Sequence, residues 1–223
     1  IKGFTELGSA FKIAMRDLSI RGAGNILGAS QSGFIDSVGF EMYSQLLEEA
    51  INKRQGKTQV RRKGNSEFNL QIDAYLPSDY ISDERQKIEI YKRIREIENH
   101  KDYQDLQDDL IDRFGEYPDQ VAYLIEIGLV KAYLDAAFAE LVDRKNDSII
   151  VRFEKASLKF FLTQDYFEAI SKTHLKARIS DNKGKVEITF DVRNKRDYEI
   201  LEELKIFGQT FMEIKERKEK IEA

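Results

Sequence analysis

The chain has 223 residues, of which 41% are hydrophobic and 34% charged, with a formal net charge of −4. This composition is sufficient for a packed core in one or two domains and excludes a wholly disordered chain. The lack of cysteine excludes a disulfide framework, the two histidines (His100 and His174) offer no zinc ligand set, and no apolar run approaches the roughly 20 residues of a membrane-spanning helix.

The first part of the chain, residues 1–56, is predicted to form a helix, a glycine-rich loop and a second helix. Apolar residues at helical spacing favour a short helix near residues 9–19, and closely spaced glycines indicate a backbone that turns sharply from there to about residue 35. A second apolar face predicts a helix over residues 37–54, which ends at Gly56.

A basic, polar stretch follows and is predicted to be a linker over residues 57–66. Together with Lys53 and Arg54, its lysines and arginines are suited to sequence-independent contact with DNA phosphates. A solvated linker is the alternative. Because the net charge of −4 gives the chain no basic excess, any contact with DNA must be local.

The remainder of the chain, residues 67–223, begins with a strand and a helical subdomain. Alternating apolar and polar residues predict a strand that starts near Phe68 and runs to Pro77. Three helices with short connections are expected after it. Ser82-Asp83-Glu84 is predicted to cap the first, whose apolar residues run from Ile88 to Ile97. The second is predicted to carry the apolar residues Tyr103, Leu106, Leu110, Ile111 and Phe114 and to end at Gly115, and the third to run over about residues 118–138.

After these helices, the spacing of apolar residues changes from the helical period to the alternation typical of strands. Strands are predicted around residues 149–153, 175–179 and 186–190, and the run Asp181–Gly184 predicts a hairpin turn between the last two. A short helix over residues 164–172 is expected between the first and the second of these strands.

The last element is a predicted helix near residues 196–217 whose apolar residues follow a 4-3-4-3 spacing. This spacing fits a helix packed on a sheet or a coiled-coil seam, and the sheet is favoured because the seam would be only about two heptads long. The predicted fold class is therefore α+β (mixed α/β). The helix–loop–helix segment precedes a domain with a helical subdomain and a small, mainly antiparallel sheet packed with a long C-terminal helix.

No catalytic, nucleotide-binding or metal site is predicted for this chain. Gly3 and Gly8 have the spacing of a phosphate-binding loop, but the Lys and Ser/Thr that such a loop requires do not follow. The glycines from Gly22 to Gly28 are one residue too long for a dinucleotide fingerprint, and there is no Gly-x-Ser-x-Gly element. We therefore expect neither a cofactor nor enzymatic activity in the chain by itself.

The loop over residues 17–33 has a composition suited to a nucleic-acid backbone. Arg21 offers charge-assisted hydrogen bonds to phosphate, or a link to a neighbouring ATPase site, and Gln31 is able to donate to a phosphate or to fix the loop. The glycines around them allow the backbone to approach a ligand closely.

The pattern Asp-Leu-x-x-Arg-Gly-x-Gly-x-x-x-Gly-x-x-Gln-x-Gly in this loop resembles the translocation motif shared by the transcription-repair coupling factor (Mfd) family and the RecG branch-migration helicases. Further stretches, Leu76–Ile81, Tyr91–Ile94 and Leu110–Asp119, resemble the coupling factors alone. The resemblance is clear from residue 1 to about residue 120. The residues that it assigns to DNA translocation are Asp17, Arg21, Gly22, Gly24, Gly28, Gln31 and Gly33.

The resemblance implies part of a bacterial, cytoplasmic protein that uses ATP and Mg²⁺ to translocate on double-stranded DNA, displaces stalled RNA polymerase and recruits UvrA for nucleotide excision repair. The nucleotide-binding motifs and the domains that bind RNA polymerase and UvrA would precede these residues in the parent protein. The chain begins at Ile1 without a methionine, which agrees with a longer protein. No membrane contact is expected.

The resemblance also implies that residues 67–223 form a regulatory domain, which packs on the UvrA-binding domain of the same protein and masks it. Asp109, Asp112 and Arg113 lie within about one helical turn and match the stretch that faces that domain in the family. An ordinary solvated helix face is the alternative for these three residues. For the whole chain, the alternatives are an interaction module with no motor role, or the equivalent part of a RecG-like DNA helicase.

Overall fold

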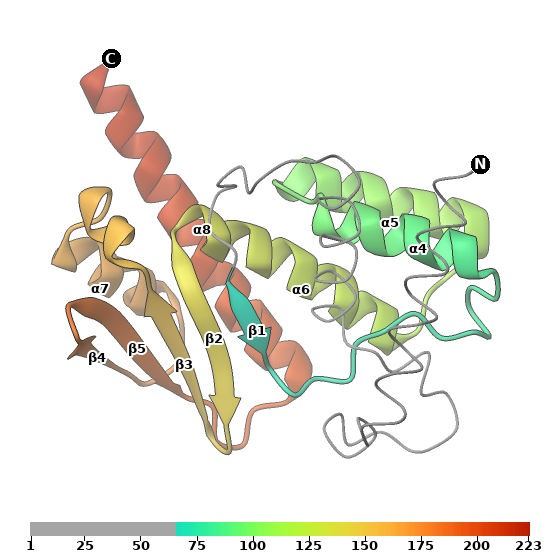
Figure 1. Cartoon of the computed structure of the whole chain (residues 1–223), viewed down its shortest axis with the longest axis horizontal. Helices are drawn as coiled ribbons and strands as arrows, with labels where there is room; N and C mark the ends of the chain where they lie inside the picture. The colour runs from blue at the N-terminus through green and yellow to red at the C-terminus, as the bar shows by residue number, and fades with distance from the viewer. Residues whose placement is uncertain (1–65) are drawn as a thin grey trace, which may run out of the picture. The chain divides into compact units, whose positions relative to one another are not determined.

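The computed structural model describes residues 66–223, which divide into two compact units (Figure 1). The helical unit consists of Asp73–Gly128, and the sheet unit consists of residues 66–72 together with Leu129–Ala223. The predicted helix–loop–helix segment, the linker up to residue 65 and every candidate translocation residue lie outside the described residues. Our predictions for those parts of the chain therefore remain predictions.

Three helices form the helical unit, and they confirm the predicted helical subdomain. They are α4 (Glu84–Arg95), α5 (His100–Phe114) and the first part of α6 (Asp119–Ala136), whose second part belongs to the sheet unit. α5 starts at His100, three residues before the first apolar residue that predicted it, because the side chain of Asn99 caps the helix by accepting from the backbone N–H of Asp102 at 2.9 Å.

Local capping explains the start of α4 and the end of α5. The carboxylate of Asp83 accepts hydrogen bonds from the backbone N–H groups of Arg85 and Gln86, at 2.8 and 3.0 Å. At the other end of the pair, Gly115 has a φ of 81° and donates its N–H to the carbonyl of Ile111 at 2.9 Å. The capping residue before α4 and the glycine after α5 are thus confirmed as helix boundaries.

Apolar side chains from all three helices form the core of the helical unit. Its fully buried residues include Ile94, Leu106, Leu110, Val121, Leu124 and Ile125. Gly128 brings α6 close to α4, since a Cβ atom there would lie 2.8 Å from Cγ2 of Ile94. Ile111 was expected on the apolar face of α5, but it is 47% exposed because it lies about 100° around the helix from the buried Leu110.

The sheet unit contains a five-stranded sheet with the strand order β1-β2-β3-β5-β4. Its strands are β1 (Glu67–Asn69), β2 (Ala139–Lys145), β3 (Ser148–Phe153), β4 (Ala177–Asn182) and β5 (Lys185–Asp191). Within the described residues, β1 and β2 pair in parallel and the three other neighbouring pairs are antiparallel. The mainly antiparallel sheet confirms the predicted fold class.

Two strands differ from the prediction. The strand expected from Phe68 to Pro77 contains only three residues, because Gln71 has a φ of 55° and turns the chain out of the extended conformation. β2 is missing from the predicted strands because a bulge between Ala139 and Leu141 interrupts the alternation that identifies a strand.

The turn between β4 and β5 confirms the predicted hairpin. Lys183 and Gly184 have φ values of 53° and 83°, as a two-residue turn between twisted antiparallel strands requires. The side chain of Asp181 supports this turn by accepting from the N–H of Gly184 at 2.8 Å.

Helices complete the sheet unit: the short 3-10 helix η1 (Lys155–Lys159), α7 (Thr163–Lys172) and α8 (Asp197–Glu222), which runs across the sheet (Figure 1). The apolar residues of α8 that were predicted to face a sheet are all buried, namely Ile200, Leu204, Phe207, Phe211 and Ile214. The sheet interpretation of the 4-3-4-3 spacing is therefore confirmed. No helix in the range 66–223 is both long enough and apolar enough to cross a membrane.

Two side chains of α6 hold Ser66, the residue that precedes β1. Asp135 accepts hydrogen bonds from the N–H of Ser66 at 2.9 Å and from its hydroxyl. Lys131 donates to the carbonyl of Ser66 at 2.6 Å and lies 3.2 Å from Oδ2 of Asp135. Burial raises the pKa of Asp135, while the positive charge of Lys131 acts in the opposite direction. The start of β1 is thus fixed through both backbone groups of Ser66.

Candidate protein interaction site

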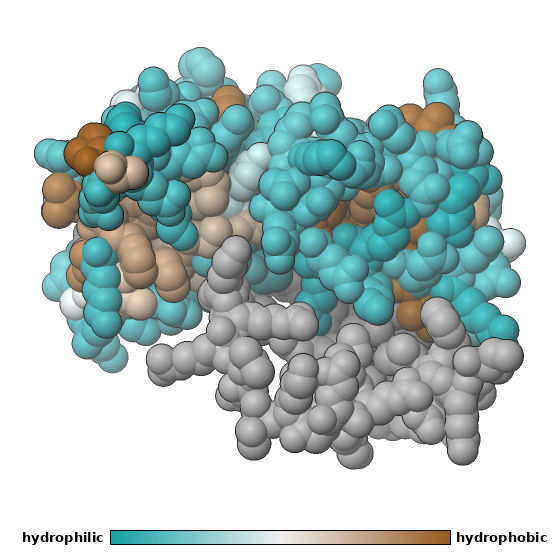
Figure 2. All heavy atoms as spheres, turned by 90° about the horizontal axis from the view of Figure 1, so that it is seen from above, coloured by the Kyte–Doolittle hydropathy of each residue, from teal (hydrophilic) through white to brown (hydrophobic). Residues whose placement is uncertain are grey.

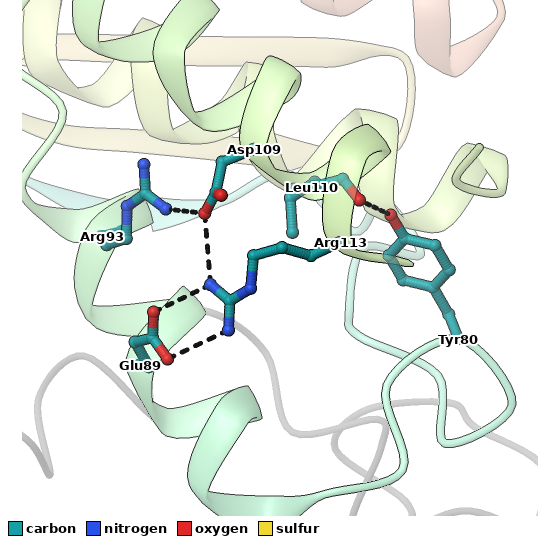
Figure 3. Close-up of polar contacts among 6 residues, drawn as sticks. All are labelled: Tyr80, Glu89, Arg93, Asp109, Leu110 and Arg113. Carbon is teal, nitrogen blue, oxygen red and sulfur yellow. Dashed lines mark hydrogen bonds and ion pairs between the residues drawn. The ribbon is translucent and has the colours of Figure 1, made fainter. Parts of the chain in front are cut away.

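Four charged side chains form a continuous cluster between α4 and α5 (Figure 3). Glu89 and Arg93 lie one turn apart on α4, and Asp109 and Arg113 lie one turn apart on α5, so each pair shares a helix face. Arg93 donates to Asp109, and Nη1 of Arg113 lies 3.2 Å from Oδ2 of the same carboxylate. The charges therefore alternate in space, and this four-residue set is called the α4–α5 charge cluster below.

Arg113 makes the most contacts in the α4–α5 charge cluster. Its Nη1 lies 2.9 Å from Oε1 of Glu89, and its Nη2 lies 3.3 Å from Oε2, so Glu89 binds the end of the guanidinium group with both oxygens. The carbon of that guanidinium group lies 4.9 Å from the centre of the Phe114 ring. Arg113 thus contacts Glu89 of α4 and, on its own helix α5, Asp109 and Phe114.

The electrostatic environment favours the charged forms of Asp109 and Arg113. Partial desolvation acts to raise the pKa of Asp109, but hydrogen bonds from Arg113 and Arg93 outweigh it and hold that pKa below its ordinary value. Hydrogen bonds to Glu89 and then to Asp109 raise the pKa of Arg113. Exposed fractions of 28% for the Arg113 side chain and 42% for Glu89 show that water reaches the cluster, so its net contribution to folding is small.

The structure brings two of the three predicted interface residues together. Asp109 and Arg113 contact each other, whereas Asp112 is exposed and has no ion pair within residues 66–223. Sequence reasoning missed Glu89 and Arg93, although an acidic and a basic residue four positions apart on a predicted helix were a usable signal. The structure does not test the contact of these residues with a partner, which stays a prediction.

The surface near this cluster is polar with one large apolar side chain. In the view of Figure 2, hydrophilic residues cover most of the described surface, and hydrophobic residues gather mainly toward the left of the view. Within Asp73–Gly128, the exposed large hydrophobic residue is Ile111, which directly precedes Asp112 on α5. The exposed part of α5 therefore combines a carboxylate, an aliphatic side chain and the half-exposed guanidinium of Arg113.

Tyr80 fixes the end of α5 next to this surface. Its hydroxyl lies 3.2 Å from the carbonyl oxygen of Leu110 (Figure 3) and 2.9 Å from that of Gly115, so it donates at the helix terminus. Its ring packs against Phe114 and Tyr117, with centroids 5.9 and 6.5 Å away. The stretch Leu76–Ile81 and the stretch Leu110–Asp119, which carry much of the family resemblance, are thus joined through one side chain.

Replacement of Tyr80 with phenylalanine is expected to lower the free energy of unfolding by about 1 kcal/mol at neutral pH, because one hydrogen bond is lost. Desolvation, and then the proximity of Tyr117, raises the pKa of Tyr80 from 10.0 to about 12 in the folded chain. The folded state thus favours the protonated hydroxyl. This stabilisation is complete below pH 10 and is lost as the pH rises toward 12.

Urea unfolding of the wild-type chain and the Tyr80→Phe variant across this pH range measures the effect. The difference in free energy between the two proteins should shrink above pH 10. Parallel pH profiles would show that Tyr80 does not titrate differently in the folded and unfolded states.

The described residues offer no metal site, since no three histidine or carboxylate side chains within 66–223 are grouped to bind an ion. Nor does the charge cluster contain a nucleophile with a paired base. The face formed by α4 and α5 carries partly exposed charges of both signs, a chemistry that suits contact with another protein surface.

Comparisons with known proteins place these features in a family. Residues 70–161 match the model of the TRCF domain family. The transcription-repair-coupling factor of Bacillus subtilis (strain 168) is 52% identical over 149 residues, which are 67% of this chain and 13% of that protein. The protein of the same name from Staphylococcus haemolyticus is 44% identical over 192 residues, which are 85% of this chain and 16% of that protein.

A solved structure is also similar to this chain. The crystal structure of a C-terminal domain of transcription-repair coupling factor shares 62% sequence identity and superposes with a TM-score of 0.69. The alignment covers 72% of this chain and 99% of that domain. By contrast, the chain spans only 13% to 16% of the length of the curated relatives above.

Proposed function

Because this chain belongs to the transcription-repair coupling factor family and corresponds to its C-terminal region, we propose that it is part of a factor that couples ATP-driven translocation on double-stranded DNA to displacement of stalled RNA polymerase. The family name supports a role in transcription-coupled DNA repair. The motor of the full-length protein would use ATP and Mg²⁺. In this proposal, Arg21 and Gln31 connect that motor to DNA.

The proposed role of residues 66–223 is to mask the UvrA-binding surface of the same protein until the motor engages DNA. The observation that supports this role is the half-exposed charge cluster on α4 and α5, next to Asp112 and Ile111. A mask has to release, and a polar surface with exchangeable ion pairs is easier to separate than an apolar one.

Removal of residues 66–223 from a full-length coupling factor that carries this sequence is expected to strengthen the binding of purified UvrA, because the masked surface is uncovered. In the intact protein, Arg113→Ala is also expected to strengthen UvrA binding, but by less than the deletion does, since only one contact with the masked surface is lost. Surface plasmon resonance with immobilised UvrA measures both effects.

Arg85→Ala is the matched control, because Arg85 is an exposed arginine on α4 outside the charge cluster. It removes the same charge and should leave UvrA binding unchanged. If neither the deletion nor Arg113→Ala changes UvrA binding, the masking role is refuted.

A further inference from the structure

We infer that Glu89 competes with the masked surface for Arg113 and so keeps the masking contact weak enough to release. This inference rests on the proposed masking function and goes beyond it, because it assigns a regulatory role to a residue of α4 that is not itself a masking contact. It also specifies the partner chemistry, which is a carboxylate placed opposite Arg113.

The geometry of the Arg113–Glu89 pair carries this inference. Glu89 occupies both terminal nitrogens of the guanidinium group, at 2.9 and 3.3 Å. A guanidinium group binds a carboxylate best through two parallel hydrogen bonds. An incoming carboxylate therefore finds the end of Arg113 already taken and has to displace Glu89 to bind there.

The exposure of the two side chains makes this exchange feasible. Arg113 and Glu89 are 28% and 42% exposed, so neither charge is trapped in the interior. Oδ2 of Asp109 lies 3.2 Å from Nη1 of Arg113, and this contact within α5 does not involve Glu89. The exchange then replaces one half-exposed ion pair with another, and its free-energy cost is small.

The charge balance acts in the same direction. Arg93 and Arg113 carry two positive charges, and Asp109 and Glu89 carry two negative ones, so the cluster has no net charge. Without the charge of Glu89, the cluster would be positive by one unit and would attract a carboxylate more strongly. Glu89 thus weakens the binding of an acidic partner in two ways: it occupies Arg113, and its negative charge repels the incoming carboxylate.

The test is Glu89→Gln in the full-length factor, with purified UvrA as the probe. Glutamine keeps the shape of the side chain and removes its charge. Because Arg113 is then free to bind the masked surface, the variant should hold the mask more tightly. Its binding to UvrA should therefore be weaker by about 2- to 5-fold, the range expected for one exposed ion pair. Arg113→Ala should act in the opposite direction, because it removes the contact that the mask needs.

Glu96→Gln is the matched control. Glu96 directly follows α4, seven residues from Glu89, and its side chain lies 4.0 Å from the exposed Lys92. The variant therefore removes the same charge outside the cluster. It should leave UvrA binding unchanged. In the double variant Glu89→Gln/Arg113→Ala, the effect of Glu89→Gln should disappear, since Glu89 acts through Arg113.

The outcomes separate this inference from the function on which it rests. If Arg113→Ala strengthens UvrA binding while Glu89→Gln leaves it unchanged or strengthens it, Glu89 is not a competitor and the inference is overturned, although the mask stands. If the deletion and Arg113→Ala are both without effect, the masking function itself fails. An effect of Glu89→Gln that persists without Arg113 would also overturn the inference.

Discussion

Replacement of Phe211 with alanine is expected to lower the free energy of unfolding by about 3–5 kcal/mol, the range for a fully buried aromatic side chain. Phe211 is 0% exposed and lies where α8 meets β3, α7 and the segment between η1 and α7. Its ring centroid is 5.0 Å from that of Phe207, 5.1 Å from Phe161 and 5.3 Å from Phe153. Alanine would leave these rings around a cavity and remove their tilted and edge-to-face contacts.

Urea unfolding followed by far-ultraviolet circular dichroism measures this loss. Ile221→Ala is the matched control, because Ile221 is on the same helix but is 79% exposed, and the change in its free energy of unfolding should stay within about 0.5 kcal/mol. A decrease in the free energy of unfolding below about 1 kcal/mol for Phe211→Ala would contradict this prediction and would show that the neighbouring rings move to fill the cavity.

Replacement of Arg21 with alanine in the full-length factor is expected to slow displacement of stalled RNA polymerase by about 10- to 100-fold. This range corresponds to about 1.4–2.7 kcal/mol, which lies close to the 1.5–3 kcal/mol typical of losing a hydrogen bond from a charged group. ATP hydrolysis should persist, because the proposed role of Arg21 is to transmit hydrolysis to DNA rather than to bind the nucleotide. Polymerase release from a stalled elongation complex and DNA-stimulated ATPase activity measure the two functions separately.

Arg16→Ala provides the control for this experiment, since Arg16 lies in the same segment but outside the motif pattern. It should retain displacement. Wild-type displacement by Arg21→Ala would contradict the motor role. In that case an interaction module without motor function becomes the better description of the chain.

The elements predicted correctly are those that local chemistry specifies. Asp83 and Gly115 mark helix ends because a carboxylate accepts from the first amides of a helix and because glycine adopts the left-handed conformation easily. Lys183-Gly184 forms the turn between β4 and β5 for the same conformational reason. These signals lie within a few residues of the structure that they determine, so the sequence is sufficient to find them.

The elements that were missed depend on residues far apart in the chain. β2 was missed. It pairs in parallel with β1, with Glu67 opposite Leu141 across more than 70 positions, and no local pattern reports that pairing. The two missing members of the α4–α5 charge cluster have a similar cause. Asp109 and Arg113 share one helix, but Glu89 and Arg93 join them only through the packing of α4 on α5.

The attachment of Ser66 has a mechanical consequence. Within the described residues, a pull from the preceding chain reaches Ser66 before the three residues of β1. The hydrogen bonds to Asp135 and Lys131 lie first along that path and connect the strand to α6 rather than to the sheet alone. Tension on the chain therefore acts on α6, through the side chains of Lys131 and Asp135, before it can separate the edge strand β1 from β2.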